Sequence, residues 1–529
     1  MAQVVVLAGL VLCATLLYRL VFARRTSATS KLPLPPSPPG DPIIGHFRQI
    51  PVLNPEYAYI KWGKELDTDV LYFNVLGRHI VVLNSVKAAN DLLDKRGANY
   101  ADRPRFALFE LMGWGVTLTF LRAGPLFRLH RTLLQTAFTP TAITRYRPVQ
   151  ASEAHLAVSR IRATPSRWSD LANTFATAVV LRIAFGLPGA APSSPYIAMA
   201  DAANHATTNG GTPAASAVDY FPALRHLPAW LTPAASPLAH ARRSRPAIRA
   251  LHDGPWDATV ADVESGRSAA PSFMRTQLEA LRAGKGGGGG AGALSVADIK
   301  GAAGAITIAG GNTTWSTIVL AVLSMLMNRR VQLKAQAELD AVLCEDGRPG
   351  EPVRLPTFED RERLPYLDLC VQEVYRWAPL SPVGVPHASV AEDEYRGWRI
   401  PAGSVVYANA QAMTHDPEIY SEPEKFNPDR FLPVKEGGRE EPLPQGPFGF
   451  GRRVCPGKHL ATAGVFIVMA TMLATMDIVP KVGEDGKEIP VTVGMSNGLS
   501  SHPDHFEVDF KPRSKQAEEL LKKVSESDV

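Results

Sequence analysis

Cysteine is scarce in this sequence, and neither sign of charge dominates it. The 529 residues include four cysteines, at positions 13, 344, 370 and 455. So few thiols over this length argue against a disulfide framework and favour a reducing compartment. The formal net charge of +5 is small for this size, which makes nucleic-acid binding a poor expectation without a local basic motif. No internal repeat is found after Ile43.

Charge is absent altogether from Gly301 to Asn328, a run that contains the stretch ITIAGGNTTWST. The apolar residues on both sides predict a long buried helix, which Gly310 and Gly311 should weaken by roughly 0.5–1 kcal/mol each. A run of this length also fits a membrane span. In addition, Asn312 begins an N-glycosylation acceptor pattern. The rest of the chain has to decide between these interpretations.

The N-terminus is apolar from Val4 to Tyr18 except for Thr15, and Arg24 and Arg25 follow a second short apolar run. A cleaved signal peptide would carry its charges before the apolar core, whereas here they follow it. Residues 1–23 are therefore expected to be an uncleaved transmembrane anchor. The positive-inside rule then leaves everything after the anchor in the cytosol.

The body follows a hinge, residues 24–42, which is basic at its start and rich in proline, as typical of a stiff spacer. Residues 43–529 are expected to form one catalytic domain. Its apolar periodicity, from about 86 to 212 and 255 to 380, predicts helices. Short strands are predicted as a hairpin at 70–75 and 80–83, and further at 395–400, 405–408, 489–493 and 506–510. The sequence thus predicts a mainly α fold with small β-sheets.

The sharpest local signal is FGFGRRVCPGKHLA, Phe448 to Ala461. Glycines and a proline predict a tight loop around Cys455, and two arginines and a lysine surround that thiol with positive charge. Backbone N–H groups, cations and the N-terminus of the following helix all favour thiolate over thiol. A cysteine held as thiolate is a nucleophile, for which His459 could be the base, or a metal ligand.

This loop resembles the haem-binding pattern of the cytochrome P450 family, Phe-x-x-Gly-x-Arg-x-Cys-x-Gly. All five fixed positions match, as Phe448, Gly451, Arg453, Cys455 and Gly457. The resemblance implies the P450 fold, with haem b between the long central helix and the cysteine loop. It implies that Cys455 is the axial thiolate of the haem iron. It also implies that Arg453 pairs with a haem propionate and that Phe448 packs against the loop.

A second family pattern, Glu-x-x-Arg, occurs five times, so position has to select among the copies. Only Glu373 and Arg376 lie on an apolar-periodic helix, and Glu373 precedes Cys455 by 82 residues (455 − 373 = 82), as the family requires. FNPDRF matches the segment whose arginine, here Arg430, joins this pair in a structural triad. A surface ion pair between Glu373 and Arg376 is the plainer alternative.

Two further propionate partners follow from the resemblance. His387 stands where the family has a basic residue facing a propionate, and Arg131 is the arginine of the family's Trp-x-x-x-Arg. Phe127 replaces the tryptophan of that pattern, which removes an indole N–H donor. We therefore expect slightly weaker haem retention.

The charge-free run matches the family's oxygen-activating motif, Ala/Gly-Gly-x-Asp/Glu-Thr-Thr. Here Gly310 and Gly311 would let the backbone approach the haem, and Thr313 would donate to the oxygen being activated. Back-bonding of such hydroxyls would help to open the helix. The departure is Asn312, because an amide does not titrate as the family's acid does. We expect a working enzyme that loses some reducing equivalents as peroxide.

The resemblance, closest to fungal secondary-metabolism P450s, implies a haem-thiolate monooxygenase of the EC 1.14 class that oxidises a lipophilic small molecule such as a terpenoid. Electrons would come from NADPH–cytochrome P450 reductase, with cytochrome b5 as an optional donor, to a monomer anchored by one span in the endoplasmic reticulum. Basic residues expected to face the reductase are Arg128, Arg452 and Lys458. A reductase-independent P450 isomerase or dehydratase, and a catalytically idle haem-binding protein, remain alternatives.

Overall fold

The computed structural model describes residues 9, 12, 31–187, 194–211, 216–266, 271–284, 295–345, 348–491, 494–496 and 500–527. These residues group into two compact units. The sheet unit comprises the chain up to residue 104 together with 383–413 and 449–454, and the helical unit comprises 105–382, 414–448 and 455 onward. The expected anchor at 1–23 and the start of the hinge lie outside the described residues, apart from positions 9 and 12.

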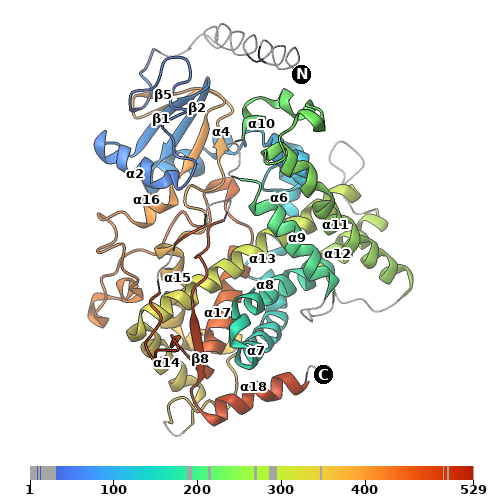
Figure 1. Cartoon of the computed structure of the whole chain (residues 1–529), viewed down its shortest axis with the longest axis vertical. Coiled ribbons are helices and arrows are strands. Elements are labelled where there is room, and N and C mark those ends of the chain that lie inside the picture. Colours follow the sequence, from blue (N-terminus) through green and yellow to red (C-terminus); the bar gives the residue numbers. More distant parts are fainter. Residues whose placement is uncertain are drawn as a thin grey trace. The chain divides into compact units, whose positions relative to one another are not determined.

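A four-stranded sheet organises the sheet unit (Figure 1). β1 (Val70–Val75) and β2 (Arg78–Leu83) form the predicted antiparallel hairpin. Leu76 and Gly77 join them with positive φ angles of 51° and 82°, as tight hairpin turns require. The other elements are α2 (Pro55–Glu65), α3 (Val86–Ala89), η1 (Asn90–Lys95), α4 (Gly97–Tyr100), β3 (His387–Ala388), β4 (Asp393–Tyr395), β5 (Trp398–Ile400), β6 (Val405–Ala408) and most of α16 (Ala410–Thr414).

The predicted long helix, α13 (Val296–Met327), is the central helix of the helical unit (Figure 1). A capping box starts it, because Ser295 and Asp298 each accept the other's backbone N–H. Among the described residues, α13 and α17 (Lys458–Thr475) are long and apolar enough to cross a membrane, but both are mostly buried inside the structure. They are core helices, which removes the support for reading α13 as a membrane span.

The other helices of this unit surround α13. Those in contact with it include α8, α9, α11, α12, α15 and α17. The bounds are α5 (Ala107–Met112), α6 (Pro125–Ala137), α7 (Arg147–Ala163), α8 (Trp168–Phe185), α9 (Pro195–Thr208), α10 (Ala217–Tyr220), α11 (Pro237–Glu264), α12 (Phe273–Arg282), α14 (Arg329–Leu343), α15 (Pro365–Trp377) and α18 (Lys515–Ser527). Short 3-10 turns include η2 (Trp114–Val116), η5 (Pro222–His226), η6 (Ala229–Leu231) and η8 (Pro428–Phe431).

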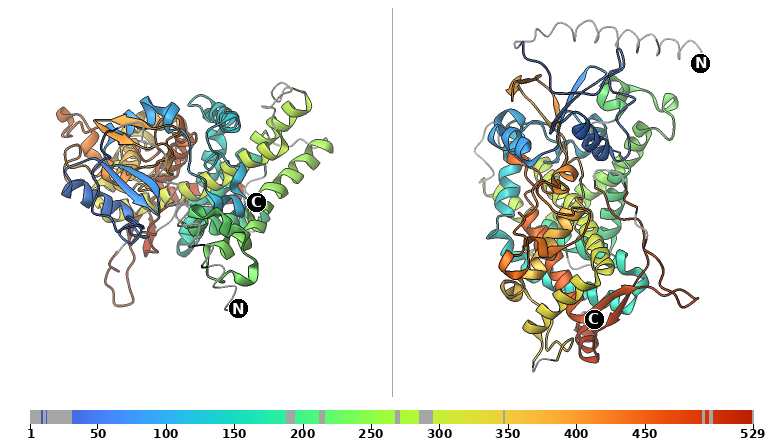
Figure 2. Two further views of the ribbon diagram at one scale, coloured as in Figure 1. Left: turned by 90° about the horizontal axis from the view of Figure 1, so that it is seen from above. Right: turned by 90° about the vertical axis from the view of Figure 1, so that its left-hand side faces the viewer.

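A two-stranded hairpin lies beside the C-terminal helix α18 (Figure 2). β7 (Met476–Pro480) pairs antiparallel with β8 (Val508–Pro512), the strand predicted two residues earlier at 506–510. β7 was not predicted, because the apolar run of α17 continues into it without a breaker. The strand predicted at 489–493 is wrong where the structure describes it, since residues 489–491 are irregular. Pro490 there has no N–H for a strand ladder.

Candidate functional site

The loop before α17 is closed by its own backbone. The N–H of Cys455 donates to the carbonyl of Phe448 at 2.8 Å. Phe448 is half-buried and packs edge-on against Tyr375 of α15, with ring centroids 4.8 Å apart. Gly449 and Gly451 have φ angles of 73° and 53°, which side chains rarely allow. The predicted tight loop around Cys455 is therefore present.

The sulfur of Cys455 is approached by donors and by positive charge. The N–H groups of Gly457 and Lys458, and the charges of Arg131 and Lys458, all act to lower the pKa of the thiol. Burial outweighs them and raises the pKa of Cys455 above its usual value. The donors and cations expected around Cys455 are therefore present, and burial opposes their effect on its pKa. A thiolate here needs further positive charge, such as a bound metal ion supplies.

The middle of α13 is exposed on one side. Ala309 is exposed although the helix is buried before and after it, and Asn312 and Thr313 are half-buried. Thr313 Oγ1 donates to the Ala309 carbonyl at 2.5 Å, and Ser316 Oγ donates to the Asn312 carbonyl at 2.9 Å. Although these back-bonds were expected to help open the helix, α13 is continuous. This turn thus places the hydroxyl of Thr313 next to the exposed Ala309.

The Cβ directions of Gly310 and Gly311 on α13 point toward α8. A Cβ on Gly310 would lie 2.6 Å from Cγ1 of Val180, and one on Gly311 would lie 3.4 Å from Oγ1 of Thr177. Both Val180 and Thr177 belong to α8. A side chain at Gly310 would therefore overlap α8, so this glycine lets α13 pack closely against α8, whereas one at Gly311 would only reach ordinary contact distance.

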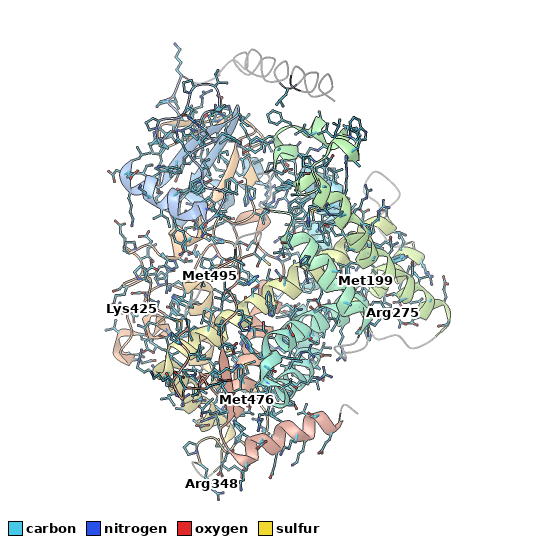
Figure 3. All side chains as sticks on the ribbon, viewed as in Figure 1. Met199, Arg275, Arg348, Lys425, Met476 and Met495 are labelled. Atoms are coloured by element: carbon cyan, nitrogen blue, oxygen red, sulfur yellow. The ribbon has the colours of Figure 1, made fainter. Side chains whose placement is uncertain are left out.

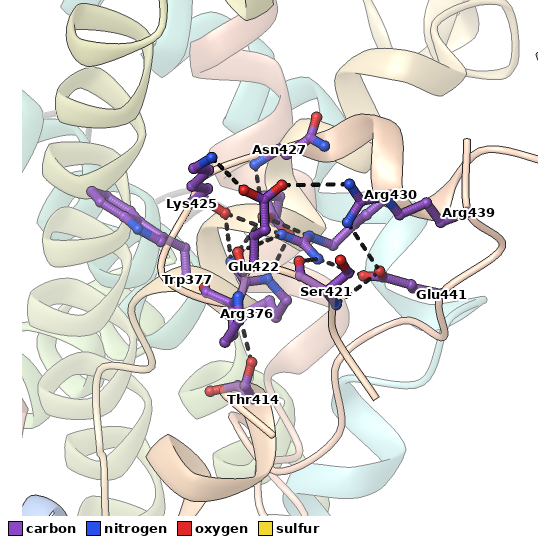
Figure 4. A network of polar contacts seen from close by, with 12 residues as sticks. Arg376, Trp377, Thr414, Ser421, Glu422, Lys425, Asn427, Arg430, Arg439 and Glu441 are labelled. Atoms are coloured by element: carbon purple, nitrogen blue, oxygen red, sulfur yellow. Dashed lines mark hydrogen bonds and ion pairs between the residues drawn. The ribbon is translucent and has the colours of Figure 1, made fainter. Parts of the chain in front are cut away.

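The structure brings Glu373, Arg376 and Arg430 together as buried residues of one polar network. Figure 4 labels its two arginines. Arg376 Nε and Nη2 donate to the Glu373 carboxylate at 2.8 and 2.9 Å, and Arg430 Nε donates to it at 3.1 Å. Their side chains are at most 1% exposed. Arg348 and Glu351, which belong to two other Glu-x-x-Arg copies, instead form an exposed ion pair with each other. Position in the fold, not the pattern, separates them.

Sequence reasoning missed a fourth member of this network. Glu441 forms an ion pair with Arg430 Nη1 and accepts the backbone N–H of Ser421 at 3.0 Å. Its side chain is 8% exposed. Without Glu441, Glu373 would face two buried arginines with a net charge of +1. No local pattern marks this glutamate, which lies in a loop eleven residues after Arg430 (441 − 430 = 11).

Within the sheet unit, two of the predicted cofactor ligands, Arg453 and His387, are buried. Arg453 Nε donates to the Ala101 carbonyl at 2.7 Å, and His387 Nδ1 lies 2.8 Å from the Tyr100 carbonyl. Burial, together with the nearby arginines, lowers the pKa of His387 to about 3, so the imidazole is neutral. As a neutral ring it would contact a carboxylate through a hydrogen bond.

Arg103, also in the sheet unit, is a buried cation that sequence reasoning missed. Its Nη1 donates to the carbonyls of Val385 and Pro386, but its Nε has no partner among the described residues. Burial and the charge of Arg453 lower the pKa of Arg103 well below its usual range. Burial makes the charge of the Arg103 guanidinium costly, and the nearby Arg453 repels it. A bound anion would therefore stabilise this site.

Arg131 and Phe127 lie on α6 in the helical unit. Phe127 is buried, and Arg131 is half-buried with its Nε 3.3 Å from Oε1 of Gln135. Burial lowers the pKa of Arg131, which the charge of Cys455 partly restores. Arg131 and Cys455 therefore interact electrostatically, and α6 contributes to the surroundings of the thiol.

Comparison with known proteins identifies the family to which this chain belongs. The model of the family described as Cytochrome P450 matches residues 35–510, nearly the whole body. The chain is a cytochrome P450. Members of this family bind haem through a cysteine thiolate and act as monooxygenases, so the fold class, the cofactor and the enzyme class predicted from the sequence are confirmed.

Curated relatives and solved structures agree with this assignment. A cytochrome P450 monooxygenase of Armillaria gallica is 36% identical, over 95% of this chain and 96% of its own. Tryptamine 4-monooxygenase of Psilocybe cyanescens is 34% identical, over 99% and 100%. A zebrafish cytochrome P450 solved with progesterone is 22% identical, with a TM-score of 0.70 over 87% of this chain and all of its own, and shows the same fold.

The residues present suit a haem. Haem carries two propionates, and the sheet unit holds Arg103 and Arg453 buried, with no partner for Nε of Arg103 in the part of the chain that the structure describes. Haem iron takes a thiolate, and the helical unit holds Cys455 with N–H groups and cations around the sulfur. In Gly451, a Cβ would lie 2.1 Å from the Leu93 carbonyl, so this loop position requires glycine.

Proposed function

We propose that Cys455 is the axial ligand of the haem and that Arg131, His387 and Arg453 hold its propionates. A haem with a thiolate ligand supplies an electron-rich iron for the activation of O₂. Phe448, Gly451 and Gly457 would shape the ligand loop, while Glu373, Arg376 and Arg430 would hold the segment that leads to it. The observation that carries this proposal is the cysteine loop, because all five motif positions are present and the N–H groups of Gly457 and Lys458, with the charges of Arg131 and Lys458, act on one sulfur.

The polar turn of α13 would manage protons. Monooxygenation of a C–H bond takes O₂, two electrons and two protons, inserts one oxygen atom and releases the other as water. Thr313 would donate its hydroxyl proton toward the reacting oxygen and regain it from its surroundings. Gly310 would fix this turn by letting α13 pack on α8. Asn312 would orient hydrogen bonds without titrating.

The substrate is proposed to be a lipophilic small molecule, with a terpenoid-like secondary metabolite as the first class to test. The segments proposed to form its wall are mostly apolar: 106–120, 210–230, 305–313 and 383–385, with 497–499 outside the described residues. Phe106 and Phe109 both pack on Phe120, with centroids 5.4 and 4.6 Å apart. The tryptamine enzyme named above makes a small aromatic amine the second class.

We further propose that NADPH–cytochrome P450 reductase supplies the electrons, with cytochrome b5 as an optional donor. Arg128 and Arg452 are exposed and Lys458 is half-buried, which suits contact with an acidic partner. The N-terminal segment would anchor the chain, as a monomer with one span, in the endoplasmic reticulum. An epitope-tagged chain that stays soluble in cell fractionation would overturn that anchoring.

Two measurements test the proposed function. Cys455→Ser should lose the thiolate signature in the carbon-monoxide difference spectrum, whereas Cys344→Ser, at a half-buried thiol in the same unit, should keep it. Turnover that depends on NADPH and reductase should follow the same division. A haem-loaded protein that converts candidate substrates without reductase would favour an isomerase or dehydratase, and one that converts none would favour an idle haem binder.

A further inference from the structure

Two helices of the helical unit, α8 and α9, carry polar side chains near the turn of α13 that contains Asn312. Asp201 on α9 accepts a hydrogen bond from Nδ2 of Asn173 on α8 at 2.9 Å. Thr177 follows Asn173 by four residues, and Asn204 follows Asp201 by three, so each pair shares one helix face. Helices α8, α9 and α13 contact one another pairwise.

We call Asn173, Thr177, Asp201 and Asn204 the polar track. It approaches α13 at Gly311. A Cβ on Gly311 would lie 3.4 Å from Oγ1 of Thr177 and 3.8 Å from Nδ2 of Asn204. Both polar groups therefore lie against the backbone next to Asn312. Thr177 is fully buried, and its hydroxyl has no hydrogen-bond partner among the described residues. A buried hydroxyl in that state is a place for an ordered water.

Asp201 is the titratable end of the track. It is half-buried, so solvent can reach it, whereas Thr177 is not accessible. Burial raises the pKa of Asp201, the hydrogen bond from Asn173 opposes this, and Asp170 raises it further. A carboxyl group with a raised pKa releases its proton more slowly but is protonated more often near neutral pH.

The opposite face of α9 fixes its position. Met199, labelled in Figure 3, is two residues before Asp201. A Cβ on Gly254 of α11 would lie 3.1 Å from Cε of Met199. α9 is thus wedged between α11 on one side and α8 and α13 on the other. The polar groups do not depend on a loop for their placement.

We propose that Asp201 and Thr177 form a proton relay that substitutes for the acid replaced by Asn312. A proton leaves the Asp201 carboxyl for a water or for Thr177, whose own hydroxyl proton passes on toward Asn312 and Thr313. Asp201 then regains a proton from solvent, so each transfer breaks one O–H bond and forms one. Neither residue touches the reacting atoms, so both are relay residues. This inference rests on the proposed monooxygenase function.

The relay is tested by coupling, the amount of product formed per NADPH consumed. The same two electrons and two protons either give product and water or leave with O₂ as hydrogen peroxide. Asp201→Asn and Thr177→Val should lower product per NADPH about tenfold, below the 10²–10⁴-fold typical of general acid catalysis because water can bypass one member. Thr177→Ser keeps the hydroxyl and should retain coupling. Thr174→Val, at a half-buried hydroxyl of α8 that donates to the Asp170 carbonyl of its own helix, is the matched control.

Restoring the family's acid with Asn312→Asp distinguishes a loss of proton relay from a loss of folding. In an Asn312→Asp background, Asp201→Asn should no longer change coupling, because the direct acid is back. An equal loss in both backgrounds, or no loss in either, overturns the proposal. Every variant is first matched for haem content and carbon-monoxide spectrum, and a wild type that shows no NADPH-dependent oxidation would refute the proposed function instead.

A crystal structure of the haem-loaded protein gives a readout that does not depend on turnover. An ordered water bonded to Oγ1 of Thr177 and within reach of Asn204 is expected. A Thr177 hydroxyl bonded to its own helix, with no water there, would overturn the relay even if the enzyme were active.

Discussion

Replacing Glu441 by glutamine tests whether charge balance holds the buried arginine network. Glu373, Arg376 and Arg430 together carry a net charge of +1 at sites no more than 1% exposed, and Glu441 at 8% neutralises it. Removing one partner of a buried ion pair costs about 3–5 kcal/mol, because the other charge stays buried and uncompensated. Glutamine still offers an oxygen to the Ser421 N–H, so we expect about 3 kcal/mol.

The assay is the free energy of unfolding of the haem-loaded protein, from urea titrations followed by fluorescence and by haem absorbance. The matched control is Glu424→Gln in the same loop region. The Glu424 side chain is 86% exposed, and its carboxylate lies 3.9 Å from Nε2 of His415. That control should stay within about 0.5 kcal/mol of wild type. If Glu441→Gln were no less stable than Glu424→Gln, the charge-balance reasoning would be refuted.

Three further predictions concern α13, α6 and the sheet unit. Gly310→Ala should destabilise by about 1–3 kcal/mol, because its Cβ overlaps Val180, and Val180→Ala should rescue it; destabilisation that persists in the double variant counts against the packing role. Phe127→Trp should improve haem loading by returning an indole N–H, and an unchanged haem content on titration would sink that idea. The pKa of His387, about 3, lies below its unfolded value of roughly 6.5. Stability should therefore be full above about pH 6.5 and fall toward pH 3 as the unfolded state takes up the proton, and His387→Gln should flatten that part of the stability curve, measured by urea titration at each pH.

Features set by neighbouring residues could be predicted from the sequence. The hairpin β1–β2, the long helix α13 and the tight loop at Cys455 depend on local periodicity and on glycine at fixed positions. Spacing along the chain selected Glu373 and Arg376 among five Glu-x-x-Arg pairs. In the structure, Glu373 accepts hydrogen bonds from both Arg376 and Arg430.

Features set by burial could not be predicted in the same way. The cations around Cys455 are present, yet the pKa of the thiol is raised, because burial outweighs them. Burial likewise makes His387 neutral and leaves Arg103 without a partner for its Nε. Sequence shows which charges are near each other along the chain, but desolvation depends on what covers them.

Asn312 shows the same limit in the oxygen-activating turn. From the sequence of α13 alone, Asn312 replaces the family's acid by an amide. Less product formed per NADPH is then the direct expectation. The groups that could compensate lie 111 and 135 residues earlier (312 − 201 = 111 and 312 − 177 = 135), on α9 and α8. Thr177 and Asn204 lie against α13 at Gly311, and the missing side chain of Gly310 lets α13 pack closely on α8. In the proposed relay, a distant carboxyl group and a buried hydroxyl together replace one acidic side chain. Asn312→Asp would then raise coupling only modestly in the wild type, but strongly in Asp201→Asn.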